Sequence, residues 1–275
     1  MSGILYLVAT PIGNLEDITF RAIKILEEVD LIAAEDTRQT LKLLNHYKIN
    51  KPLISYHRHN EDIKVDGLIK DLKEGKNIAL VSDAGTPVIS DPGEVIVKNA
   101  IKENIKIIPI PGACALINAL ITSGLDTREF SFYGFLPINK KLRKDKLEEI
   151  KKENKTIILY EAPHKLNNTL VDLEKIIEDR QVVIARELTK IHEEFIRGTV
   201  KEIMEKYPEP RGEHIILIQG SNIKAKDEES EMLNNMTIKE HYNYYEKQGL
   251  TKNEIIKKIA KDRKVNKNEI YKMFI

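Results

Sequence analysis

Short apolar runs alternate with amphipathic stretches along the N-terminal part of the chain, and this alternation constrains the fold more than any other feature. The runs resemble buried strands and are Ile4–Ala9, Leu31–Ala34, Leu53–Ser55, Ile78–Val81 and Ile105–Ile110. Apolar residues at helical spacing lie between them, in Ile18–Val29, Thr37–Tyr47, Val65–Lys73 and Gly93–Glu103. Strands that alternate with helices form βαβ units, so we expect a parallel sheet with ligands bound beyond the carboxyl ends of its strands.

A second and less regular series of elements follows. Its predicted strands are Phe130–Phe135, Thr156–Tyr160, Val182–Ala185 and His214–Gln219, with a short antiparallel piece at Phe195–Gly198. Helices are predicted at Lys141–Lys151 and Lys165–Ile177. A helix that ends at Ser123-Gly124 lies between the two series. The pattern therefore predicts a two-domain α/β protein, with a parallel sheet in residues 1–118 and a mixed sheet in residues 119–222.

The C-terminal segment, residues 223–275, differs from the rest in charge and in pattern. The stretch Ser221–Met232 is polar and is predicted to be a linker. Three short helices are predicted after it, at Ile238–Gln248, Lys252–Arg263 and Lys267–Phe274. From Met236 onward the chain has ten Lys/Arg against five Asp/Glu, although the whole chain has a net charge of only +1. These helices could form a helix-turn-helix module that binds a polyanion, or a dimer-contact or packing bundle with a solvated basic face.

Several classes of protein are excluded by what the sequence lacks. A single cysteine, Cys114, allows no internal disulfide, and His57, His59 and His164 lack metal-ligand spacing, so we expect no metal site. The dinucleotide, P-loop and hydrolase signatures G-x-G-x-x-G, G-x-x-x-x-G-K-[ST] and G-x-S-x-G do not occur. No apolar run reaches the roughly 18–20 residues that span a bilayer, and no signal peptide precedes the first run. We therefore expect a cytoplasmic protein that does not enter a membrane.

Three loops at predicted strand ends could hold a ligand. The loop within Leu80–Gly93 combines glycines and prolines with two aspartates, which allows close backbone approach and provides carboxylates. The loop Ala9–Asp17 follows the first strand, and the small residues of Ile110–Leu116 open a helix whose N-terminus can face a ligand. Tight turns, a helix cap and close helix–sheet packing are the structural alternatives. Charged clusters follow four other strands, in Ala34–Arg38, Ser55–Glu61, Tyr160–His164 and Ala185–Lys190.

Eight segments of the sequence, in the order in which they occur, resemble one family. They are VATPIGNLEDIT, AEDTR, SYHRHNE, LVSDAGTPVISDPG, PIPGACA, FYGFLP, YEAPH and ARELTKIHEE. They are similar to the ribosomal RNA small subunit methyltransferase I family, a branch of the tetrapyrrole-methylase-like superfamily. The match runs from about Ile4 to Ile218, and the basic C-terminal helices are less diagnostic.

The resemblance implies the cofactor, the reaction and part of the site. It implies a homodimer that uses S-adenosylmethionine to methylate the 2′-oxygen of a cytidine ribose, cytidine 1402, in the decoding region of 16S rRNA within the small ribosomal subunit. By matching motif positions, it implies cofactor contacts at Pro11, Asp83, Ala84, Gly85, Thr86, Cys114, Ala115, Glu161 and Ala162. The turn at Pro11 departs from the glycine-rich turn of cobalamin-pathway relatives, which disfavours a porphyrin-like substrate.

The charged clusters supply candidates for catalysis and for RNA binding. A base that removes the ribose hydroxyl proton would assist the reaction, and the unranked candidates are Glu35, His57, Glu161, His164 and Glu187. The candidates for phosphate binding are Arg38, Arg58, Arg186 and Lys190, which could instead form structural ion pairs. Two other functions stay open: methylation of a small tetrapyrrole-like substrate, and a non-catalytic RNA-binding role in ribosome assembly.

Overall fold

The computed structural model describes residues 2–177, 179–222, 232–233, 235–263 and 265–274. It divides into two compact units, Met1–Ile150 with Lys155–Gln219, and Lys151–Asn154 with Gly220–Ile275. Most of the predicted linker, residues 223–231, lies outside the described residues. Both predicted sheets belong to the first unit, and the domain boundary at residues 118 and 119 stays a prediction.

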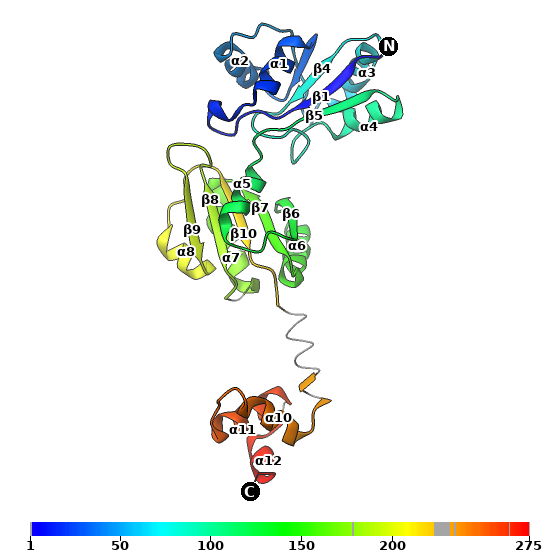
Figure 1. Cartoon of the computed structure of the whole chain (residues 1–275). Helices are drawn as coiled ribbons and strands as arrows, with labels where there is room; N and C mark the ends of the chain where they lie inside the picture. The colour runs from blue at the N-terminus through cyan, green and yellow to red at the C-terminus, as the bar shows by residue number, and fades with distance from the viewer. Residues whose placement is uncertain (1, 178, 223–231, 234, 264, 275) are drawn as a thin grey trace. The chain divides into compact units, whose positions relative to one another are not determined.

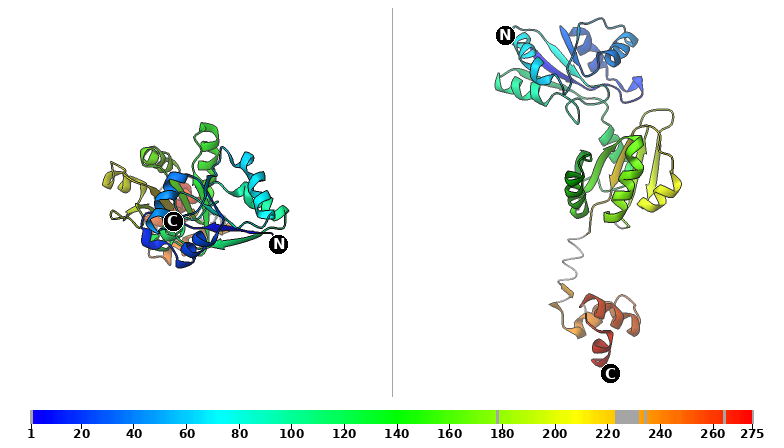
Figure 2. Two further views of the ribbon diagram at one scale, coloured as in Figure 1. Left: turned by 90° about the horizontal axis from the view of Figure 1, so that it is seen from above. Right: turned by 180° about the vertical axis from the view of Figure 1, so that it is seen from behind.

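The first sheet is entirely parallel, as predicted. It is built from β1 (Ile4–Val8), β2 (Leu31–Ala34), β3 (Leu53–Ser55), β4 (Ile78–Val81) and β5 (Lys106–Ile110), in the order β3-β2-β4-β1-β5. Its helices are α1 (Phe20–Glu28), α2 (Thr37–His46), α3 (Glu61–Lys73) and α4 (Glu94–Lys102). Figures 1 and 2 show α1 and α2 on one side of this sheet and α3 and α4 on the other.

Alternation of side chains along the strands explains this layering. In β1, Leu5 packs into the core shared with α3 and α4, whereas Val8 packs into the core shared with α1 and α2. Both faces of a parallel sheet are covered by its crossover helices, so its strands read as continuous apolar runs. Helix α3 begins at Glu61 rather than at the predicted Val65, because two acidic residues in its first turn suit a helix N-terminus although they break the apolar pattern.

The second sheet is mixed, as predicted. It contains β6 (Phe130–Phe135), β7 (Thr156–Glu161), β8 (Val182–Arg186), β9 (Glu194–Gly198) and β10 (His214–Ile218), in the order β6-β7-β10-β8-β9. Strands β6 and β7 pair in parallel and the other neighbours are antiparallel, including the edge strand β9. Strand β10 lies at the centre and is fully buried, with alternate residues packed into cores on opposite faces.

Helices cover both faces of the second sheet. Helix α5 (Ala115–Ser123) packs on β8 and β10, and Gly124 ends it in the left-handed conformation. The apolar residues of α6 (Lys140–Lys152), α7 (Pro163–Ile177) and α8 (Val200–Lys206) belong to the core on the opposite face. Helix α8 was not expected from the sequence, because it is only seven residues long and buries only Val200 and Ile203, with Met204 partly buried beside them. A capping box between Thr199 and Glu202 begins it.

The second unit contains the three C-terminal helices that the sequence predicts. They are α10 (Ile238–Glu246), α11 (Lys252–Asp262) and α12 (Lys267–Lys272), and they enclose a small core of their own. Capping boxes begin α10 at Thr237 and α11 at Thr251. Within the part of the chain that the structure describes, no helix is long and apolar enough to cross a membrane.

Candidate functional site

A pocket of about 410 Å³ lies within the first unit, lined by residues of both sheet regions. The loop after β4 contributes residues 84–86 and 89–91, and the start of α5 contributes Cys114 and Ala115. Ile12, in the loop after β1, also lines the pocket. Loops and strand ends of the second sheet supply the rest, including Phe135, residues 160–163 and residues 213–215. The pocket therefore lies at the carboxyl ends of β4 and β5, where an open parallel sheet binds ligands.

Hydrogen bonds fasten together the loops that follow β1, β4 and β5. Thr10 and Gly85 exchange two backbone hydrogen bonds, of 2.9 and 3.0 Å, and the Thr86 hydroxyl donates to the Ala113 carbonyl at 3.1 Å. Gly85 has a φ of +81°, and a Cβ at this position would lie 3.0 Å from Cγ2 of Ile12. A glycine is needed here because the backbone is left-handed and the neighbouring loop approaches closely.

The loop after β4 has a strained backbone, which hydrogen bonds from other segments hold in place. Val88 and Ser90 have φ values of +77° and +66°, which is unusual for a residue with a side chain and rarest for a β-branched one. The Arg58 guanidinium donates a hydrogen bond to the Ser90 carbonyl, and the Gly93 N–H donates to the Glu61 carboxylate at 3.3 Å. Strained backbone of this kind persists only where the surroundings fix it, and it concentrates at functional sites.

Three carboxylates gather at this edge of the first sheet: Glu35 after β2, and Asp83 and Asp91 after β4. The Asp83 carboxylate accepts a hydrogen bond from the Asp36 N–H at 2.9 Å, and Glu35 accepts one from the Asp83 N–H at 3.4 Å. Burial, followed by repulsion from Glu35, raises the pKa of Asp91 to about 6. Burial also raises the pKa of Glu35 and of Asp83. With a pKa of about 6, the Asp91 carboxyl can exchange protons near neutral pH.

Glu161 is the one predicted catalytic candidate on the pocket lining, and its carboxylate already has two partners. It is 5% exposed. One oxygen accepts a hydrogen bond from the Thr169 hydroxyl at 2.5 Å and the other from the Ala162 N–H at 2.9 Å. Arg143 extends the chain by donating to the Thr169 hydroxyl at 2.8 Å and to Asp172 at 2.9 Å. This network fixes Ala162 and Pro163 at the pocket wall.

An aromatic surface forms another part of the wall. The Tyr160 ring packs edge-on against Phe132 and Phe135, with ring centroids 4.9 and 5.7 Å apart. Burial raises the pKa of Tyr160 to about 12, so the phenol stays protonated at neutral pH. This side of the pocket offers apolar faces to a ligand.

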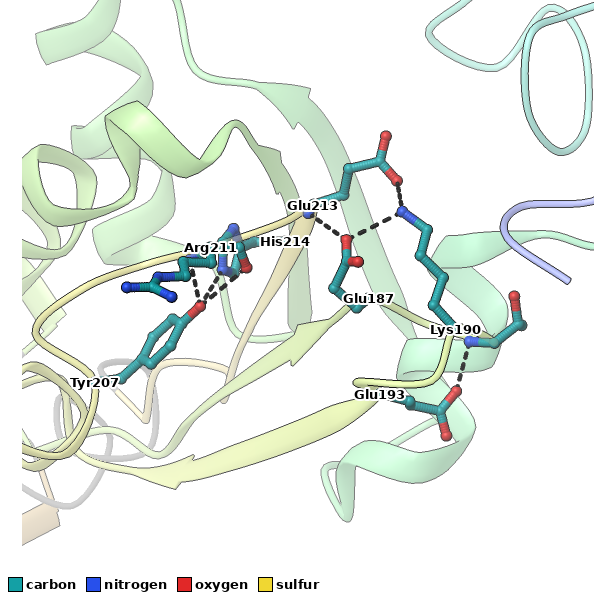
Figure 3. A network of polar contacts seen from close by, with 8 residues as sticks. Glu187, Lys190, Glu193, Tyr207, Arg211, Glu213 and His214 are labelled. Carbon is teal, nitrogen blue, oxygen red and sulfur yellow. Dashed lines mark hydrogen bonds and ion pairs between the residues drawn. The ribbon is translucent and has the colours of Figure 1, made fainter. Parts of the chain in front are cut away.

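A polar network at the β8–β10 end of the second sheet contains two of the predicted residues, Glu187 and Lys190 (Figure 3). The Glu187 carboxylate accepts hydrogen bonds from Lys190 Nζ and from the Glu213 N–H, both at 3.0 Å. Lys190 also contacts Glu213 at 3.1 Å. Gly212, with a φ of +78°, leaves room for Glu187. Glu187 and Lys190 thus already have structural partners.

The remaining predicted residues are spread more widely. Arg186 pairs with Glu194 at 3.1 Å, and Arg38 pairs with Asp36 at 2.7 Å. His57 Nε2 lies 3.1 Å from the Asn60 side-chain amide, and His164 is exposed at the start of α7. Among the described residues, His, Cys, Asp and Glu form no group of three or more that could hold a metal ion.

The pocket brings together most of the predicted cofactor contacts. Those on its lining are Ala84, Gly85, Thr86, Cys114, Ala115, Glu161 and Ala162. Pro11 and Asp83 are adjacent in sequence to the lining residues Ile12 and Ala84. Sequence reasoning did not single out Asp91 or Tyr160. Asp91 belongs to the loop that it selected, but its burial depends on segments distant in the sequence.

Comparison with known proteins first defines the class. The model of the family described as tetrapyrrole (corrin/porphyrin) methylases matches residues 4–204. A crystal structure of diphthine synthase superposes with a TM-score of 0.62 at 14% identity, covering 79% of this chain and 90% of that one. The structure of cobalt precorrin-4 methyltransferase superposes with a TM-score of 0.57 at 19% identity, and the match covers 78% of this chain and 94% of that one. At these identities the likenesses show the fold, which is that of the tetrapyrrole methylases.

Relatives of higher identity narrow the assignment. Ribosomal RNA small subunit methyltransferase I of Bacillus subtilis is 53% identical over 271 residues, covering 98% of this chain and 93% of the relative. The protein of the same name from Halalkalibacterium halodurans is 52% identical, and the match covers 99% of this chain and 94% of the relative. That from Thermotoga maritima is 49% identical, and the match covers 79% of this chain and 99% of the relative. This chain belongs to the ribosomal RNA small subunit methyltransferase I family, a family of methyltransferases.

Proposed function

We propose that this protein uses S-adenosylmethionine to methylate the 2′-oxygen of a cytidine ribose in 16S rRNA, at cytidine 1402 of the decoding region. The observation that carries the proposal is the pocket at the loops after β4 and β5, whose lining contains seven of the nine residues expected to contact the cofactor. We further propose that the protein acts in the cytoplasm as a homodimer, on RNA within the small subunit.

The residues of the pocket fit the cofactor. Alanines and Gly85 leave room for a nucleoside, while Tyr160 and Phe135 offer it apolar surface. Ala115 begins α5, and a helix N-terminus favours a carboxylate such as that of the methionine part. Asp83, next to the lining residue Ala84, provides negative charge near a ligand that carries a sulfonium and an ammonium.

The reaction supported by this site is a direct displacement in which the chain supplies position. S-adenosylmethionine, when bound, provides an electrophilic methyl group on its sulfonium. The loops after β1, β4 and β5, joined by hydrogen bonds, hold the ligand in one orientation. Alignment of reacting groups can lower the activation free energy of a reaction by up to roughly 7–11 kcal/mol in ideal cases. A hydroxyl is a weak nucleophile until its proton leaves, so a neighbouring base contributes further.

The candidate phosphate contacts differ in how accessible they are. The Arg38 side chain is 86% exposed beside Asp36 and can reach a phosphate. Like Arg38, which pairs with Asp36, the less accessible Arg58, Arg186 and Lys190 have local partners, so RNA binding by any of the four would require shared or exchanged hydrogen bonds. The basic helices α10–α12 are a further candidate surface for RNA.

Methyl transfer to small subunits tests the proposed function directly. We expect the full-length protein to transfer label from methyl-labelled S-adenosylmethionine to small subunits that lack the modification. Nucleoside analysis should place the label in 2′-O-methylcytidine. Label on a cytosine base would contradict the ribose assignment. Transfer to a porphyrinoid but not to RNA would favour a small tetrapyrrole-like substrate, and RNA binding without transfer would favour an assembly factor.

Replacing Gly85 by alanine is expected to weaken the affinity for S-adenosylhomocysteine about tenfold, measured by calorimetry. A left-handed alanine costs about 1 kcal/mol, and its Cβ would lie 3.0 Å from Ile12, so Gly85 or Ile12, both on the pocket lining, would be displaced from the position that fits the ligand. Gly67→Ala is the matched control, because a Cβ there meets nothing within 4 Å and the residue lies inside α3. Equal affinities for the two variants would place the ligand elsewhere.

A further inference from the structure

The carboxylate of Asp91 lies on the pocket wall but is not among the residues expected to contact the cofactor. Asp91 lines the pocket beside Ser90 and Ile89. The other acidic candidate on the lining, Glu161, has both carboxylate oxygens engaged, by Thr169 and by Ala162. Asp91 has a hydrogen-bonding interaction with the Ser82 hydroxyl. It is therefore the better placed of the two to accept a proton from a molecule in the pocket.

The backbone around Asp91 is fixed on both sides. Arg58 holds the carbonyl of the preceding Ser90, and Glu61 holds the N–H of Gly93, two residues after Asp91. The intervening residue, Pro92, has a restricted φ. Ser90 itself has a left-handed φ of +66°. Anchors from the loop after β3 and from α3 thus hold a strained loop in the position that brings Asp91 to the pocket, as expected for a pre-organised catalytic group.

The charged and titratable groups around Asp91 come from several elements. Glu35 after β2 and Asp83 after β4 repel its charge, whereas Arg58 after β3 attracts it. Tyr160 of β7 lines the same pocket, and the charge of Asp91 adds to the effect of burial in disfavouring ionisation of that phenol. The net result is a carboxylate that is ionised at neutral pH but more basic than an exposed aspartate.

We propose that Asp91 is the base that accepts the proton of the attacking ribose hydroxyl, an inference that rests on the proposed function. The hydroxyl oxygen forms the new bond to the methyl carbon as the electron pair of the carbon–sulfur bond stays with sulfur. The proton passes to an Asp91 carboxylate oxygen and then to water. A base whose pKa lies near the working pH suits this step, because it is both ionised and basic.

The test compares rate, affinity and pH dependence. Asp91→Asn is expected to lower the methyl-transfer rate to small-subunit RNA about 100-fold to 10,000-fold, the usual contribution of a general base. Its affinity for S-adenosylhomocysteine should stay within about threefold of the parent protein. Asp66→Asn, on the exposed face of α3, removes the same charge and serves as the control. The rate of the parent protein should rise with pH through about 6, because the base must be ionised.

Glu35→Gln adds a readout that a structural role of Asp91 would not move. Removing the Glu35 charge lowers the pKa of Asp91, so the acidic limb of the pH–rate profile should shift to lower pH. The comparison of pH–rate profiles uses only the parent protein and Glu35→Gln, so it can be made even if Asp91→Asn does not fold.

Three results would overturn the assignment. They are an Asp91→Asn rate within about threefold of the parent rate, a loss of affinity as large as the loss of rate, and an unshifted limb in Glu35→Gln. Total label in RNA decides this test, whereas the labelled position within the nucleoside tests the proposed function. Failure of one can therefore be told from failure of the other.

Discussion

Between pH 7 and pH 4, the free energy of unfolding is expected to fall by about 3 kcal/mol less in His214→Gln than in the parent protein. His214 is 3% exposed at the start of β10, beside the Tyr207 hydroxyl (Figure 3). Burial, followed by the charge of Arg186, lowers its pKa from 6.5 to about 4. A histidine with a depressed pKa contributes its full stability above pH 6.5 and loses it as the pH falls toward 4, since the unfolded chain binds the proton more readily.

Urea unfolding of the full-length protein and of His214→Gln, followed by circular dichroism, measures this difference. Glutamine keeps an amide that can reach Tyr207 but does not titrate. Asp91 and Glu35 have raised pKa values, so their contribution to stability has the opposite sign and is lost as the pH rises. Their contribution is common to both proteins and cancels in the comparison. Equal losses of stability in the two proteins between pH 7 and pH 4 would contradict the prediction.

Replacing Glu161 by alanine is expected to lower the free energy of unfolding by about 3 kcal/mol. The buried carboxylate satisfies the Thr169 hydroxyl and the Ala162 N–H, and alanine would leave both without that partner beside a cavity. Because Ala162 and Pro163 line the pocket, the affinity for S-adenosylhomocysteine should also fall, by about tenfold.

Denaturant unfolding and calorimetry check both effects of the Glu161 change. Glu174→Ala, on the exposed side of α7, is the matched control and should change stability by less than about 0.5 kcal/mol. Glu161→Gln keeps an acceptor for one of the two donors and should give an intermediate loss of stability. A loss below about 1 kcal/mol in Glu161→Ala would show that the hydrogen bonds seen here contribute little.

Much of the fold could be predicted because local periodicity reports burial. The strands predicted at Ile78–Val81 and Val182–Ala185 are correct to within one residue, since strands covered on both faces are continuous apolar runs. Helix α8 was missed, because seven residues of which only two are buried give a periodic signal too weak to recognise. The start of α3 was misplaced because its first turn is stabilised by charge and contributes little to the core.

The site could be predicted less fully, for a physical reason. The sequence selected the loop after β4, but it did not separate Asp91 from Asp83, because their environments are set by residues of other elements. The pKa of Asp91 depends on Glu35 and Arg58, which precede it by more than thirty positions and belong to different loops. The roles of Arg186 and Lys190 likewise depended on finding Glu194 and Glu213 beside them.

The sequence by itself determined the order and type of the main elements and the division into two α/β series with a basic helical tail, because these follow from local patterns. It also determined the family, because motifs of consecutive residues identify it. The tertiary structure decided the strand orders β3-β2-β4-β1-β5 and β6-β7-β10-β8-β9, and hence which loops meet at the pocket. It also decided that the partly buried carboxylates of Glu35 and Asp91 interact with one another. Strand order and electrostatic environment arise from contacts between distant residues, and a local sequence pattern does not encode them.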